Sequence, residues 1–176
     1  MLANVMNLFE AGFDFIPDVL NQDANTDITG DWVNLENYER AYLLLIKPAG
    51  TAGDDLAIRL QQATDNAASG EKALTFTKLW YKKGTMSSQG TWTAVELTTP
   101  SSDLDLDSVN STDLAMDTSA AVVLVEVRAD SLDGAGGFNH VNVLWEGDDI
   151  ANALVINSHW LLWGNRYPQA IPLSAL

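Results

Sequence analysis

The sequence contains no cysteine and few basic residues. Without cysteine the chain forms no disulfide and offers no thiolate to zinc, which fits a reducing cytoplasm but does not exclude export. Nine Lys and Arg residues stand against 24 Asp and Glu residues, giving a formal net charge of -15. Because such a chain repels a phosphate backbone, we expect no nucleic-acid partner.

Long hydrophobic runs and catalytic signatures are also missing. Nowhere do 18 apolar residues follow one another, so we expect no membrane partner. The first 20 residues contain no Lys or Arg, so we do not expect a cleaved export signal. No Gly-x-Ser-x-Gly, His-Glu-x-x-His, Walker or dinucleotide motif occurs, and we therefore predict no enzymatic activity, no catalytic residues and no cofactor.

What the chain does contain is a series of short apolar runs separated by polar loops. The run Ala121–Arg128 predicts a mostly buried strand, and residues 138–145 predict a half-buried strand that follows a loop rich in glycine and aspartate. We expect these two strands to form a hairpin-like pair. The continuous apolar run from Arg40 to Lys47 is typical of a central strand. Further strands are expected at residues 31–38, 56–62, 73–81, 91–98 and 151–163. Pro100 is expected to end the strand at 91–98, and a short helix is the alternative for 151–163.

No helical period continues after residue 22, which favours an all-β, antiparallel β-sandwich with a jelly-roll-like topology. The 176 residues suit a single such domain, expected at residues 29–176 and preceded by an extended N-terminal arm and linker at residues 1–28. Ten large apolar residues in the first 20 require a surface to cover. Packing on the arm's own domain and docking on a partner both satisfy that requirement.

Metal sites and acid–base sites find little support. His140 and His159 each lie inside an apolar strand pattern, as structural histidines do. The acidic run from Asp103 alternates like the start of a calcium loop, but Ser108 and Leu114 replace the required glycine and glutamate. We predict no metal; a looser calcium site is the alternative to a solvated acidic loop, and it would draw on Asp103, Asp105, Asp107, Asp113 and Asp117. Glu146, Asp148 and Asp149 have no nucleophile beside them in the sequence.

Aromatic and large apolar side chains are the better candidates for function. Six tryptophans are many for this length, and they suit core packing, a partner interface or a sugar-stacking platform. We take as candidate partner-binding residues Phe9, Phe13, Phe15, Ile16 and Trp32.

Several segments resemble structural proteins that tailed bacteriophages encode with their head genes. These segments consist mostly of turn and strand-edge residues and span about residues 29–170: Thr29–Tyr38, Ala49–Leu56, Gln61–Asp65, Lys72–Phe76, Val127–Asp133 with Gly137 and Phe138, and Arg166–Pro168. The resemblance carries no catalytic signature and does not extend to residues 1–20.

The resemblance implies a non-enzymatic virion protein with a β-sandwich, a capsid decoration or cement protein. Such a protein is made in the host cytoplasm, binds the major capsid protein on the outer surface of the capsid and stabilises the head; a homotrimer is implied as well. The acidity of the chain favours the outer surface, because an inner lining faces packaged DNA with like charge. The alternative is a carbohydrate-binding β-sandwich module that uses exposed tryptophans and a calcium ion from the acidic segment.

Overall fold

The structure, a computed structural model, describes residues 13–54, 56–84, 91–109, 112–147, 150 and 153–165. Strands account for nearly all regular structure in this part of the chain. The exceptions are two short 3-10 turns, η1 (Ala129–Ser131) and η2 (Gly134–Gly136). Among the described residues we find no helix with the length and apolar character that a membrane crossing requires.

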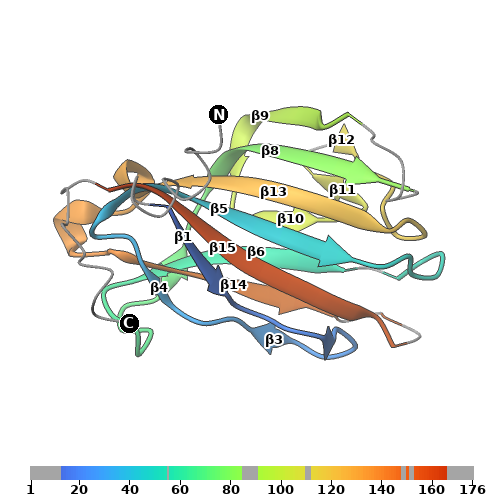
Figure 1. Cartoon of the computed structure of the whole chain (residues 1–176), viewed down its shortest axis with the longest axis horizontal. Coiled ribbons are helices and arrows are strands. Elements are labelled where there is room, and N and C mark those ends of the chain that lie inside the picture. The colour runs from blue at the N-terminus through green and yellow to red at the C-terminus, as the bar shows by residue number, and fades with distance from the viewer. Residues whose placement is uncertain are drawn as a thin grey trace, which may run out of the picture.

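Two antiparallel sheets form the molecule, and they lie face to face (Figure 1). The first sheet has the order β1 (Asp14–Pro17), β15 (Val155–Asn165), β5 (Tyr38–Lys47), β13 (Ala121–Arg128), β8 (Phe76–Lys83), β9 (Thr93–Ser101), with β2 (Gln22–Asp23) also beside β15. The second sheet has the order β10 (Asp103–Asp105), β6 (Ala57–Ala63), β14 (His140–Glu146), β3 (Ile28–Thr29), with β4 (Val33–Asn34) also beside β14 and β7 (Lys72–Ala73) beside β6. A small ribbon joins β11 (Ser108–Val109) to β12 (Thr112–Asp113).

The chain crosses between the sheets in the manner of a jelly roll. Four strands of the first sheet, in the order β1-β15-β5-β13, stand against four of the second, in the order β3-β14-β6-β10. Along the chain these eight strands alternate between the two sets, except that β6 and β10 both belong to the second; β8 and β9 come between them and widen the first sheet. The topology confirms the prediction of an all-β, jelly-roll-like sandwich.

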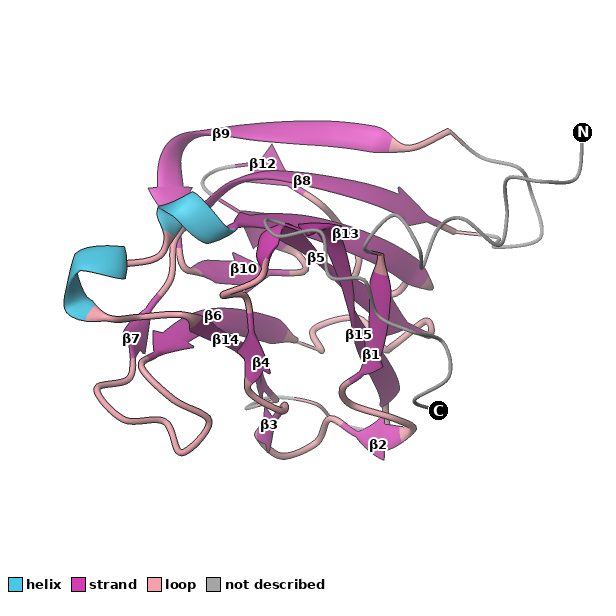
Figure 2. Ribbon diagram, turned by 60° about the vertical axis from the view of Figure 1, so that its left-hand side comes forward, coloured by secondary structure: helices cyan, strands magenta, loops and turns pink. Residues whose placement is uncertain are grey.

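Strict alternation of side chains produces the core between the sheets. In β5 the inward side chains of Leu43 and Leu45 are fully buried, and in β13 Val123 and Val125 occupy the same layer. From the second sheet come Ile58, Leu60, Val141, Val143 and Trp145, all with no exposed surface. Figure 2 shows the two layers from the side, with β8, β9 and β13 in one and β6 and β14 in the other.

Three details differ from the sequence-based expectations. The strands at 121–128 and 140–146 are not a hairpin, because β13 pairs with β5 and β8 in the first sheet while β14 pairs with β6 in the second. The connector of residues 129–137 therefore crosses from one sheet to the other. Pro100 lies inside β9, which extends to Ser101; β9 is an edge strand, where a missing N–H is tolerated. Only two of the residues expected as a strand at 31–38 pair as β4 before β5 begins.

The segment assigned to the arm and linker joins the sandwich earlier than predicted. Asp14–Pro17 pairs with β15 as strand β1, and Ile28–Thr29 pairs with β14 as β3. Between them Val19 is 1% exposed, and its carbonyl accepts a hydrogen bond from Ser158 N at 2.8 Å. From residue 13 onward the arm therefore packs on its own domain, which was one of the two alternatives left open by the sequence; the other was docking on a partner.

Candidate partner-binding surface

The predicted partner-binding residues separate into two places. Phe13 packs edge-on against Trp163, with ring centroids 6.1 Å apart, and Phe15 lies 5.0 Å from the ring of His159. Both pairs stand at the β1–β15 edge of the first sheet. Ile16 and Trp32 instead line a groove beside β3 and β4. Phe9 lies outside the described residues.

The outer face of the first sheet is apolar from β1 to β8, and none of its central residues was predicted. We call this surface the apolar face. Its apolar members point away from the second sheet, since they alternate with the buried side chains along each strand, and most are half-buried. They are Phe15, Tyr42, Leu44, Ile46, Trp80, Val122, Leu124 and Leu161.

Strand register brings these residues into continuous rows. Leu124 in β13 lies opposite Leu44 in β5 and opposite Trp80 in β8. Leu44 in turn lies opposite His159 in β15. A second row runs from Phe15 through Leu161 to Tyr42, and a third joins Ile46 and Val122. Side chains opposite one another within a row lie about 5 Å apart, and neighbouring rows are two residues, about 7 Å, apart along each strand, so the rows form one surface.

The charge of the apolar face differs from that of the whole chain. It carries four basic residues, Arg40, Lys78, Lys82 and Arg128, and two acidic residues, Glu96 and Glu126, a formal charge of +2 in a chain of -15. Arg40 and Lys78 pair with Glu126 and Glu96 at 3.1 and 3.0 Å. The excess of acidic residues therefore lies elsewhere on the molecule.

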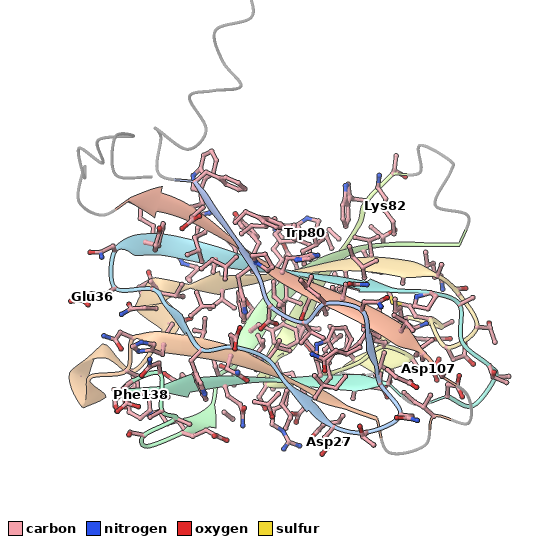
Figure 3. All side chains as sticks on the ribbon, turned by 60° about the horizontal axis from the view of Figure 1, so that its bottom comes forward. Asp27, Glu36, Trp80, Lys82, Asp107 and Phe138 are labelled. Carbon is pink, nitrogen blue, oxygen red and sulfur yellow. The ribbon has the colours of Figure 1, made fainter. Side chains whose placement is uncertain are left out.

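Lysine and aromatic side chains form the β8–β9 side of the face. Lys78 Nζ lies 5.1 Å from the ring centre of Trp80, and Lys82 Nζ lies 5.1 Å from that of Trp92, which is 44% exposed. Figure 3 shows Trp80 and Lys82 on one side of the molecule and Asp27 on the opposite side. An ammonium group over an aromatic ring is attracted to it, at about 0.5 to 1 kcal/mol at an exposed site, so these contacts favour the observed placement of the two rings.

His159 contributes to the same face as an uncharged ring. Burial lowers its pKa below the ordinary value, and its Nδ1 is buried without a hydrogen-bond partner in the described part of the chain. The imidazole is therefore neutral at pH 7 and lies beside the ring of Phe15. The other histidine, His140, is half-buried, and its Nδ1 lies 2.6 Å from Asn139 Oδ1.

The outer face of the second sheet is polar and gives a direct contrast. Arg59 pairs there with Asp103 and Glu146, each at 2.9 Å. Leu144 is its half-buried leucine, and it lies opposite Thr29 and Arg59 rather than opposite other apolar residues. Among the described residues, a continuous apolar surface is therefore found on the first sheet and not on the second.

The acidic segment does not assemble a metal site in the described part of the chain. No group of three or more carboxylate or imidazole side chains there is close enough to share an ion. Asp103 pairs with Arg59, and Asp105 accepts a hydrogen bond from the backbone N of Asp107. Burial, and then the negative charges of Asp117, Asp105 and Asp113, raise the pKa of Asp107, so this segment is a mutually repelling acidic surface.

Comparison with protein-family models finds no match to this chain, and comparison with curated protein sequences finds none either.

Proposed function

We propose that the protein is a non-enzymatic structural component of a virion, a decoration or cement protein that binds the major capsid protein on the outer surface of the shell. The apolar face is the observation that carries the proposal. A monomeric soluble protein rarely exposes a continuous apolar patch of more than a few hundred Å². The resemblance of the chain to tailed-phage head proteins supplies the identity of the partner.

The size of the face suits a protein partner. The five strands that carry its apolar members lie about 4.8 Å apart, and at about five residues of about 3.4 Å each they cover about 400 Å². A standard protein interface takes about 800 Å² from each partner. The face alone therefore provides about half of such an interface, and the aromatic side chains at its two edges, Phe13 and Trp163 on one side and Trp92 on the other, extend it.

The charge distribution also favours docking through the apolar face. A protein with a net charge of -15 keeps its acidic surfaces toward solvent when it docks through a face that is close to neutral. Removing a charged residue from water is costly, and docking through the apolar face would do this to only six charged side chains, five of which are already in ion pairs.

A pair of matched substitutions tests the role of the face. Leu124→Asp places a carboxylate at its centre, between Leu44 and Trp80. Leu144→Asp makes the same change at a half-buried leucine in the middle of a strand in the second sheet. We expect the first variant to be absent from purified particles and the second to be present in wild-type amounts, as measured by quantitative mass spectrometry.

The stabilising role has its own test. Capsids that lack the protein should break at a lower temperature and under milder osmotic shock than intact ones. Equal resistance, or absence of the wild-type chain from purified particles, contradicts the proposal. The resemblance also leads us to propose a homotrimer, which sedimentation of the purified protein measures directly.

A further inference from the structure

The groove that contains Trp32 lies outside the apolar face. It has a volume of about 520 Å³, within the range of about 300 to 1,000 Å³ typical of small-molecule sites. Ile16 from β1 and Asn66 from the β6–β7 loop contribute to its lining together with a continuous segment, residues 29–34, which connects β3 to β4. In Figure 1 these two strands lie along the edge of the second sheet.

The wall that carries Trp32 is a bulge held in place from inside. Residues 30–32 leave the ladder between β3 and β4, both of which pair with β14. Asn142 in β14 has no exposed surface, and its side-chain amide donates to the carbonyl of Gly30. Gly30 N donates to Val143 O at 2.9 Å, and Asp31 N donates to Asp18 Oδ1 at 2.6 Å. Bulges of this kind redirect side chains and often lie beside functional sites.

Glycine is required at the start of the bulge. A Cβ at Gly30 would lie 2.4 Å from Asp18 Oδ1. The close approach places the next two residues, Asp31 and Trp32, at the surface of the groove. Asn66 is fixed in a similar way, because the preceding Asp65 accepts hydrogen bonds from Ala67 N at 2.9 Å and Ser69 N at 3.1 Å. Both sides of the groove are therefore formed before any ligand arrives.

The polar groups of the groove have unused hydrogen-bonding capacity. The side chains of Asp31, Trp32 and Asn66 form no hydrogen bond within the described part of the chain, and Asn34 uses only its Oδ1, which accepts from Glu36 N at 2.7 Å. The set combines one indole, one carboxylate and two amides. An indole offers an apolar surface to the C–H face of a ring, while the carboxylate accepts and the amides both donate and accept.

From this arrangement we infer that the groove is a binding site for a neutral oligosaccharide. Sugar rings present C–H groups on one face and hydroxyl groups around the rim, which matches an indole flanked by carboxylate and amide groups. Anionic ligands are disfavoured by the carboxylate of Asp31 and by the net charge of -15. The inference does not depend on binding to a capsid shell, because no residue of the apolar face lines the groove.

The experiment is a glycan array with the full chain, followed by calorimetry with the best neutral ligands among hexasaccharides of glucose, N-acetylglucosamine, mannose and galactose. We expect a Kd of about 0.1 to 1 mM. Trp32→Ala should weaken binding at least about tenfold, and Asn66→Ala, at an exposed loop position that leaves the fold intact, about threefold or more. Trp92→Ala removes a tryptophan that immediately precedes β9, at the far edge of the first sheet, and should leave the affinity unchanged.

Three results overturn the inference. One is that no neutral glycan binds at concentrations up to about 10 mM, which corresponds to a binding free energy weaker than about -3 kcal/mol. Another is binding that survives both Trp32→Ala and Asn66→Ala. The third is binding that Trp92→Ala reduces as much as Trp32→Ala does, because the site would then lie at the edge of the apolar face.

Discussion

Asp18 connects the two sheets through a network of hydrogen bonds, and the pKa of its carboxyl group is raised toward neutral pH. Its Oδ2 accepts a hydrogen bond from Ser158 Oγ at 2.7 Å, and its Oδ1 accepts one from Asp31 N at 2.6 Å. Ser158 Oγ also accepts from Trp145 Nε1 and from Val19 N, each at 3.3 Å. Burial raises the pKa of Asp18 from 3.8 to about 6, although these hydrogen bonds favour the ionised form.

The raised pKa fixes the sign of the pH effect. A carboxyl group whose pKa is higher in the folded chain binds its proton more tightly there than in the unfolded chain. The stability that this proton contributes is complete below about pH 3.8 and is lost as the pH rises through about 6. The shift corresponds to about 3 kcal/mol in total, of which about 2 kcal/mol falls between about pH 4.5 and about pH 7.5.

Denaturant unfolding of the wild type and of Asp18→Asn at several pH values measures this effect. Many other acidic groups titrate as well, so the relevant quantity is the difference in unfolding free energy between the two proteins. Relative to that of the variant, the unfolding free energy of the wild type should fall by about 2 kcal/mol between about pH 4.5 and about pH 7.5. Asp31→Asn removes an exposed carboxylate of the same bulge whose charge is the smallest of the causes that act on the pKa of Asp18, so this variant should keep most of the pH dependence of the wild type. A difference that does not change with pH, or that favours the wild type as the pH rises, refutes the reasoning.

Three further changes test the fold around this network. Gly30→Ala should cost about 1 to 3 kcal/mol of unfolding free energy, because its Cβ would collide with the Asp18 carboxylate, whereas Gly134→Ala meets nothing within 4 Å and should stay within about 0.5 kcal/mol. Ser158→Ala leaves three buried groups without their hydrogen-bond partner and should cost about 2 to 4 kcal/mol in the same denaturant assay. Circular dichroism should show an intact sandwich after deletion of residues 1–12 and a large loss of stability after deletion of residues 1–22, which removes β1.

Regular alternation and apolar runs predict most of the sandwich from the sequence. The strand at Leu56–Gln62 shows a clean two-residue period, and β6 occupies nearly the same residues. The run Ala121–Arg128 matches β13 residue for residue, and the preference for strand over helix before Gly164 is confirmed by β15. In each case a single strand carries its own signal, which does not depend on where the rest of the chain lies.

Pairing and local distortion could not be predicted, because they depend on residues distant in sequence. The alternation of apolar residues in β13 and β14 fits a hairpin as well as it fits two strands in different sheets. The two strands lie in different sheets because of how the sheets pack, which their own residues do not encode. The bulge at Gly30 depends on Asp18 and Asn142, which are 12 residues before it and 112 residues after it. Trp32 was identified as an aromatic candidate, but its three polar neighbours in the groove gave no signal of their own.

The strongest functional signal was present in the sequence and was interpreted as burial within the chain itself. A strand that is apolar at every position, such as Leu43–Ile46 in β5, is typical of strands covered on both faces. The second sheet covers only one face of β5, at Leu43 and Leu45, and no described residue packs a second layer over Leu44 and Ile46. The same holds for β13, whose outward Val122 and Leu124 lie opposite Ile46 and Leu44. Because neighbouring strands show the same two-sided pattern in register, their outward sides form one continuous apolar surface in the described part of the chain, and this surface is the basis of the proposed interface.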